Sequence, residues 1–273
     1  LVLCDRLRSQ FRVVNGTLYH FNSGMYEANK DKIDSFVLDH VVRAKLWHSN
    51  NERLNLSANQ RARVTNIIIK LLKQCKDIQI NAREWQDRLR NSSRGYLLFA
   101  NGYLEMSTLN FTPLNHPAYN RDILFAERIT YNWEPSLLNE DVKQDVLNTL
   151  FIEPLNADVG RYLLTTIAIA ARGEPQKRFM MCQGASGAGK SLVGHAISMA
   201  LDGYVGNFQS AELLCRKSST KDASDMRAWL NRQYKRLVIS QEFSMDATIN
   251  GVLLKQLTSG GADEIVGRCL FQE

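Results

Sequence analysis

The sequence has few of the features that mark small extracellular or membrane proteins. Its five cysteines form no C-x-x-C pair, and its five histidines have no ligand spacing. This argues against a zinc site or a disulfide framework, and we expect reduced, mostly packed thiols in an intracellular protein. No apolar run approaches the roughly 20 residues that span a bilayer. We therefore expect no membrane partner.

Low-complexity tracts, internal repeats and a signal peptide are also missing, and only five residues are proline. With 44% hydrophobic and 23% charged residues, the composition is that of a globular protein. A length of 273 residues allows one large or two ordinary domains. The chain begins with Leu rather than Met, so we expect it to be a piece of a longer protein.

Acidic residues are scarce in the first half of the chain. Residues 1–133 hold 19 Lys and Arg against 12 Asp and Glu, a balance of +7, whereas residues 134–273 have a balance of −1. Such a basic half suits contact with a polyanion, although a solvated basic surface explains it equally well.

The first half is expected to be mainly helical with a few short strands. Apolar residues at helical spacing predict helices over 31–47 and 58–75. Short strands are expected over 11–21 and 96–106, each with an Asn-Gly turn, at Asn15-Gly16 and Asn101-Gly102. A loop rich in Pro and Asn follows, and the predicted domains are residues 1–133 and 134–273.

The second half alternates between helical and strand patterns. Helices are expected over 141–151, 158–171 and 192–201, with shorter ones near Ala211 and over 225–231; strands are expected over 178–183, 204–208 and 236–240. This alternation predicts an α/β fold whose mostly parallel sheet is flanked by helices and binds a nucleotide at its carboxyl edge.

One glycine-rich segment fits the pattern G-x-x-x-x-G-K-[ST] at every fixed position. It consists of Gly184, Ala185, Ser186, Gly187, Ala188, Gly189, Lys190 and Ser191. The predicted strand before it and the predicted helix after it are the context of a phosphate-binding P-loop. We expect backbone N–H groups to hold the phosphates of ATP, Lys190 to reach the β- and γ-phosphates, and Ser191 to coordinate Mg²⁺.

A second acidic element is predicted about 50 residues further along. The strand over 236–240 is followed by Gln241 and Glu242, where a Walker B carboxylate would stand. Glu242 is therefore our candidate for holding Mg²⁺ and activating the attacking water. Because Gln241 is not acidic, Glu242 would serve both roles.

The segment over 251–268 carries Lys255, Gly260, Gly261, Asp263 and Arg268, and its residues 255–263 read K-Q-L-T-S-G-G-A-D. Together with the P-loop, Glu242 and the "N-G-Y-L-E-M…F-T-P" segment over 101–113, it resembles the superfamily 3 helicases of poxvirus type and the phage and plasmid primase–helicases. The segment is two residues longer than the usual family form. The resemblance covers about residues 10–273.

The resemblance implies an AAA+-like P-loop NTPase preceded by a mainly helical α+β pre-helicase domain. It implies an ATP-dependent DNA helicase that acts in viral, phage or plasmid DNA replication, at the intracellular site where that replication takes place. Such a helicase works as a homohexameric ring that moves on single-stranded DNA. Lys255 and Arg268 are the implied DNA contacts, and a primase or polymerase is an implied partner. The family's sensor Asn and arginine finger would lie beyond residue 273, so we expect weak ATP hydrolysis from this chain alone.

Two other classes remain open on the sequence. A nucleotide kinase would also have a P-loop, but it needs an arginine-rich lid and has no use for the Gly-Gly-x-Asp segment. A nucleotide-binding assembly module without turnover is the second alternative. A phosphate-acceptor assay and a DNA-stimulated ATPase assay separate these from a helicase.

Overall fold

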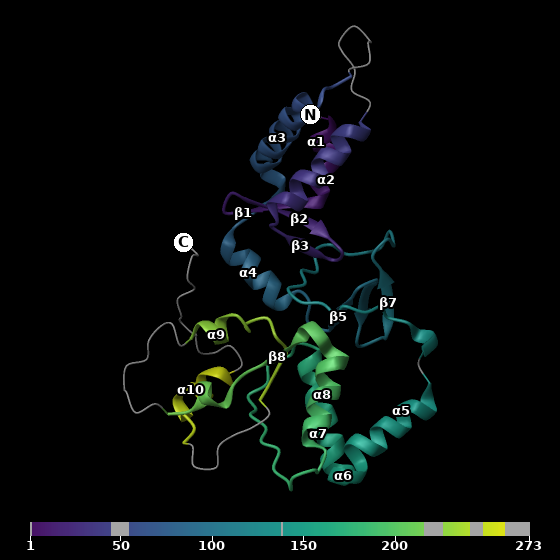
Figure 1. The fold of residues 1–273 in the computed structure, drawn as a ribbon, viewed down its shortest axis with the longest axis vertical. Helices are drawn as coiled ribbons and strands as arrows, with labels where there is room; N and C mark the ends of the chain where they lie inside the picture. The colour runs from purple at the N-terminus through teal and green to yellow at the C-terminus, as the bar shows by residue number, and fades with distance from the viewer. Residues whose placement is uncertain (1, 45–54, 138, 216–225, 241–247, 260–273) are drawn as a thin grey trace. The chain divides into compact units, whose positions relative to one another are not determined.

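The computed structural model describes residues 2–44, 55–137, 139–215, 226–240 and 248–259 (Figure 1). The chain divides into two compact units. Unit 1 comprises Leu1–Ser92 and Asn120–Phe125, and unit 2 comprises Ser93–Tyr119 and Ala126–Glu273. The predicted domain boundary between residues 133 and 134 stays a prediction.

Unit 1 contains a four-stranded sheet in the order β3-β2-β1-β4. Its strands are β1 (Phe11–Val14), β2 (Thr17–Asn22), β3 (Met25–Glu27) and β4 (Gln79–Ile80). Only the β1–β4 pair is parallel. The predicted turn between β1 and β2 is confirmed: Asn15 and Gly16 both have positive φ, as a two-residue hairpin requires.

The described part of unit 1 also contains the α-helices α1 (Val2–Leu7), α2 (Lys30–Arg43), α3 (Ala58–Gln74) and α4 (Ala82–Asn91). The helix predicted over 58–75 is confirmed, and so is the one predicted over 31–47 as far as residue 43. Positions 45–47 lie outside the described residues. The core of unit 1 centres on Phe11, Val37 and Leu72, whose side chains are fully buried.

Unit 2 begins with a three-stranded antiparallel sheet of β5 (Tyr96–Phe99), β6 (Gly102–Glu105) and β7 (Asn110–Pro113). Its helices are α5 (Glu140–Leu147), a π-helical turn (Asn148–Ile152), α6 (Glu153–Leu155), α7 (Ala157–Ala171), α8 (Lys190–Leu201), α9 (Arg227–Leu230) and α10 (Gly251–Leu257). Two strands, β8 (Val205–Asn207) and β9 (Leu237–Ile239), pair in parallel.

The expected α/β fold with a mostly parallel, AAA+-like P-loop sheet is wrong. The described residues form a mixed α+β structure with small, mostly antiparallel sheets, and their parallel pairing is limited to β1–β4 and β8–β9. The strand expected over 178–183 is part of the reason, because these residues are exposed and irregular. A short apolar run does not indicate which other segment of the chain it would pair with. A strand without such a partner in a sheet does not form.

None of the helices in the described ranges is long and apolar enough to cross a membrane.

Candidate functional site: the glycine-rich loop and its surroundings

The segment Gly184–Ser191 forms a tight, exposed turn that leads directly into α8. Gly187 and Gly189 have φ of 77° and 78°, a region that only glycine enters without strain, and no atom lies near the Cβ position of either. The Lys190 side chain folds back over this turn. Its Nζ donates to the carbonyl oxygens of Gly184 at 2.8 Å and Ala185 at 2.7 Å. The Lys190 ammonium thus lies against the backbone of its own loop.

Helix α8 begins differently from the other substantial helices. Each other described helix of seven or more residues starts at an Asn or Ser whose side chain accepts a hydrogen bond from the first turn, at positions 29, 57, 81, 139, 156 and 250. The N-cap of α8 is Gly189, which offers no side-chain cap. Its first backbone N–H groups therefore lack the usual partner and are available to an anion.

The strand predicted to carry the acidic element lies next to this helix. Ile239 lies at the end of β9, and its Cγ2 atom would be 3.9 Å from a Cβ atom added at Gly194 in α8. The sequence continues from β9 to Glu242, but Glu242 lies outside the described residues, and so does Arg268. The positions of these two predicted site residues stay untested.

Lys255 is exposed in the last turn of the seven-residue helix α10. Leu253 and Leu257 hold the other side of α10 in a small core with Trp229. This packing leaves the Lys255 ammonium accessible, as a contact with DNA requires, but it does not bring Lys255 to the glycine-rich loop by any described contact.

Sequence reasoning missed Arg236, which joins three parts of unit 2. Its guanidinium donates to the carbonyl oxygens of Ser93, Tyr96 and Ala171 and lies 4.2 Å from the centroid of the Tyr204 ring. An arginine at the start of a strand gives no signal of such a role. Because Arg236 directly precedes β9, it fixes where this strand begins beside α7 and β5.

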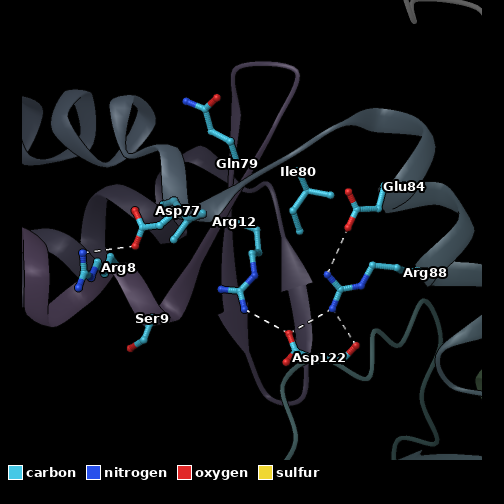
Figure 2. Close-up of a pocket in the computed structure, with 10 residues that line it drawn as sticks. Arg8, Ser9, Arg12, Asp77, Gln79, Ile80, Glu84, Arg88 and Asp122 are labelled. Atoms are coloured by element: carbon cyan, nitrogen blue, oxygen red, sulfur yellow. Dashed lines mark hydrogen bonds and ion pairs between the residues drawn. The ribbon is translucent and has the colours of Figure 1, made fainter.

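Unit 1 contains a hollow of about 450 Å³ (Figure 2). Its charged lining consists of Arg8, Arg12, Arg88, Asp77, Glu84 and Asp122. Asp122 lies 3.6 Å from Arg12 and 3.1 Å from Arg88. Three cations face three carboxylates here, so the hollow has no net charge to attract an anion. The ion pairs of Asp122 instead link the segment Asn120–Phe125 to the other residues of unit 1.

The described cysteines are free thiols, but fewer are packed than expected. Cys4 is buried, with its Sγ 4.0 Å from that of Cys75, whereas Cys182 and Cys215 are exposed. Burial and the neighbouring Cys75 raise the pKa of Cys4 to about 11. Cys269 lies outside the described residues. Within the described ranges, no three His, Cys, Asp or Glu residues gather where they could hold a metal ion.

Comparison with known proteins agrees with the resemblance seen in the sequence. The model of the family described as D5 N terminal like matches residues 1–153, more than half of the chain. The match ends before the glycine-rich loop. A protein of Sputnik virophage named "Putative helicase V13" is 25% identical over 268 residues.

The alignment with the virophage protein covers 96% of this chain but only 33% of the relative. The chain thus spans about a third of the length of the protein it matches. The predicted kinship with poxvirus-type helicases is confirmed at the level of the family, which accounts for the mixed α+β structure of the first half. The chain belongs to the D5 N-terminal-like family and carries the N-terminal domain of a D5-like helicase homologue.

Proposed function

We propose that the chain binds ATP with Mg²⁺ at Gly184–Ser191 and that the hydrolysis of ATP drives a superfamily 3 type helicase along single-stranded DNA. The uncapped start of α8 carries this proposal. A helix that leaves its first N–H groups free, after a turn with two left-handed glycines, suits the phosphates of a nucleotide.

The residues of the loop fit such a ligand. The Lys190 ammonium now binds two carbonyl oxygens of its own loop, and a phosphate oxygen is a stronger, charged acceptor for the same donors. Ser191 follows in the first turn of α8, where its hydroxyl can join the coordination of Mg²⁺. The metal would supply charge neutralisation at the phosphates.

Other parts of the proposal come from the sequence. Glu242 is the proposed carboxylate for Mg²⁺ and the attacking water, and Lys255 and Arg268 are the proposed cations that contact single-stranded DNA. Assembly as a homohexamer and cooperation with a primase or polymerase belong to the same proposal. The name of the virophage relative, "Putative helicase V13", supports it.

ATP binding is the first step to test. We expect Lys190→Ala to weaken binding of a fluorescent ATP analogue at least about tenfold, because a charged hydrogen-bond donor is lost. Lys143→Ala is the matched control, since Lys143 is an exposed lysine of the same unit that pairs with Glu140. Equal affinity in wild type and Lys190→Ala would place the nucleotide elsewhere.

Turnover is the second step. Glu242→Gln should keep ATP affinity within a factor of about three and lower hydrolysis by about 10²-fold or more, as expected for removal of a general base. Hydrolysis is measured with and without single-stranded DNA, and unwinding with a tailed duplex. ATP binding without DNA-stimulated turnover would favour the assembly module over the helicase.

A further inference from the structure

Helix α3 has a composition unlike that of its neighbour α2. Its 17 residues include Arg61, Arg63, Lys70 and Lys73 and no acidic residue. Helix α2, which packs against α3 in unit 1 (Figure 1), balances three Lys and Arg with three Asp. Helix α3 therefore carries a net charge of +4, whereas the Lys, Arg and Asp residues of α2 sum to zero.

Three of the four cations share the outer side of α3. Thr65, Ile68 and Leu72 are buried against the core of unit 1. At 100° per residue, Arg63 and Lys70 lie opposite these buried residues, Lys73 lies about 60° further round the helix, and all three are exposed. The exposed amides Asn59, Asn66 and Gln74 accompany them. We call this surface, from Asn59 to Gln74, the α3 basic face.

The cations of the α3 basic face differ from those of α2 in their partners. In α2, Lys32 lies 2.6 Å from Glu27 and Arg43 lies 2.9 Å from Asp39. Arg63, Lys70 and Lys73 form no ion pair with any other residue of the described ranges. Their charges are thus not neutralised by the described residues of unit 1, and a polyanion is the complementary partner.

We propose that the α3 basic face binds the phosphates of single-stranded DNA without reading its bases. The cations at positions 63, 70 and 73 extend over about 15 Å of helix, long enough to contact several phosphates. The neighbouring amides can donate further hydrogen bonds to phosphate oxygens. Ile67 is a half-exposed, large apolar side chain on this side. One such side chain offers too little apolar surface for insertion into a membrane.

This inference rests on the proposed action on DNA, but it places a contact in unit 1, whereas the loop at 184–191 belongs to unit 2. Such a contact would hold the strand while a nucleotide-dependent contact in unit 2 is released. It assigns a role to the family domain itself, which lacks the glycine-rich loop.

The test compares two variants with the same change of net charge. One is Arg63→Gln/Lys70→Gln/Lys73→Gln; the matched control is Lys30→Gln/Lys32→Gln/Arg43→Gln on α2. Anisotropy of a labelled oligothymidine gives the affinity between about 50 and 300 mM salt. We expect the first variant to bind roughly tenfold more weakly at low salt, with a log–log salt slope smaller by about 2, since each lost phosphate contact in a single strand removes about 0.7.

The control variant should keep a slope within about 0.5 of wild type. An unchanged slope in the α3 variant, an equal loss in the control, or no binding of wild type at the lowest salt would each overturn the inference. So would binding to vesicles of anionic lipid but not to the oligonucleotide. All six side chains are exposed, and thermal unfolding of each variant verifies that it is folded.

Parallel measurements with Lys190→Ala separate this inference from the proposed function. Lys190→Ala should lose ATP affinity and keep its affinity for DNA in the absence of nucleotide. If wild type fails to bind ATP while its DNA binding depends on the α3 basic face, the proposed function fails and the inference stands. The reverse pattern overturns the inference alone.

Discussion

Arg236 is a charged side chain that binds carbonyl oxygens and a tyrosine ring, with no carboxylate partner among the described residues. We expect Arg236→Met to lower the free energy of unfolding of unit 2 by about 2–4 kcal/mol, because several buried acceptors lose their donors at once. Arg236→Lys should recover only part of this, since an ammonium cannot span the same acceptors. Urea unfolding provides the measurement, with Lys143→Met as the control expected to change little. A cost below about 1 kcal/mol for Arg236→Met would contradict the role assigned to it.

His20 gives unit 1 a pH dependence of known sign. Burial lowers its pKa to about 4, with Glu27 opposing and His40 adding to the shift. In the unfolded chain the pKa is about 6.5, so between about pH 6.5 and 4 the unfolded state binds more protons. Stability therefore falls as the pH falls through this window, by on the order of 1–3 kcal/mol.

The measurement is the unfolding midpoint of wild type and His20→Gln from pH 7 to pH 4.5. The variant should lose less stability on acidification, because it has no imidazole to protonate. Parallel pH profiles for the two proteins would show that other groups, such as paired carboxylates, govern the acid response.

At the scale of the element, the segment Asn120–Phe125 is held against the other residues of unit 1 by two kinds of contact. Leu124 is buried with Val14 and Trp85, while Asp122, 69% exposed, pairs with arginines. We expect Leu124→Ala to cost about 2–4 kcal/mol and Asp122→Ala at most about 1 kcal/mol, since exposed ion pairs contribute little. Thermal unfolding of both variants tests this order. A larger cost for Asp122→Ala would mean that the ion pairs dominate.

The junction between the π-helical turn and α7 depends on a glycine. A Cβ added at Gly160 would meet the carbonyl oxygen of Phe151 at a distance that no structure tolerates. Gly160→Ala should therefore destabilise unit 2 by about 1–3 kcal/mol. Gly251→Ala is the control, because its Cβ meets open space at the start of α10 and should be neutral or stabilising. Equal midpoints for the two variants in thermal unfolding would show that α7 can shift away.

The elements that sequence patterns predicted well are those with local causes. The hairpin turn at Asn15-Gly16 follows from residues that accept positive φ, and α3 follows from its apolar period together with a Ser57–Gln60 capping box. The strand expected over 178–183 failed because strand formation depends on a partner elsewhere in the chain. For the same reason the extent of parallel pairing could not be predicted from alternating helices and strands.

In the candidate site, too, the features with local causes could be predicted and those that depend on distant segments could not. The left-handed glycines at 187 and 189 follow from a motif whose spacing is local. The hydrogen bonds of Lys190 to its own loop and the junction at Arg236 could not be predicted, because they depend on how backbone oxygens from distant segments converge. A motif predicts the local backbone conformation, whereas the packing of distant segments determines what the side chains contact.

At the scale of the whole molecule, each unit has a core of its own, around Phe11 and Leu72 in unit 1 and around Ile129 and Tyr204 in unit 2. Separate cores allow separate unfolding transitions. We expect calorimetry to show two transitions, of which the His20→Gln substitution at pH 5 moves only that of unit 1.

ATP with Mg²⁺ should raise only the transition of unit 2, because the glycine-rich loop belongs to that unit. A ligand at 100 times its dissociation constant adds about 2.7 kcal/mol, which corresponds to roughly 5–10 °C for a unit of this size. In Lys190→Ala the shift should vanish while both transitions remain. If ATP raised the transition assigned to unit 1, or if a single transition moved as a whole, nucleotide binding would be coupled to the folding of unit 1, and the α3 basic face and the loop would not act independently.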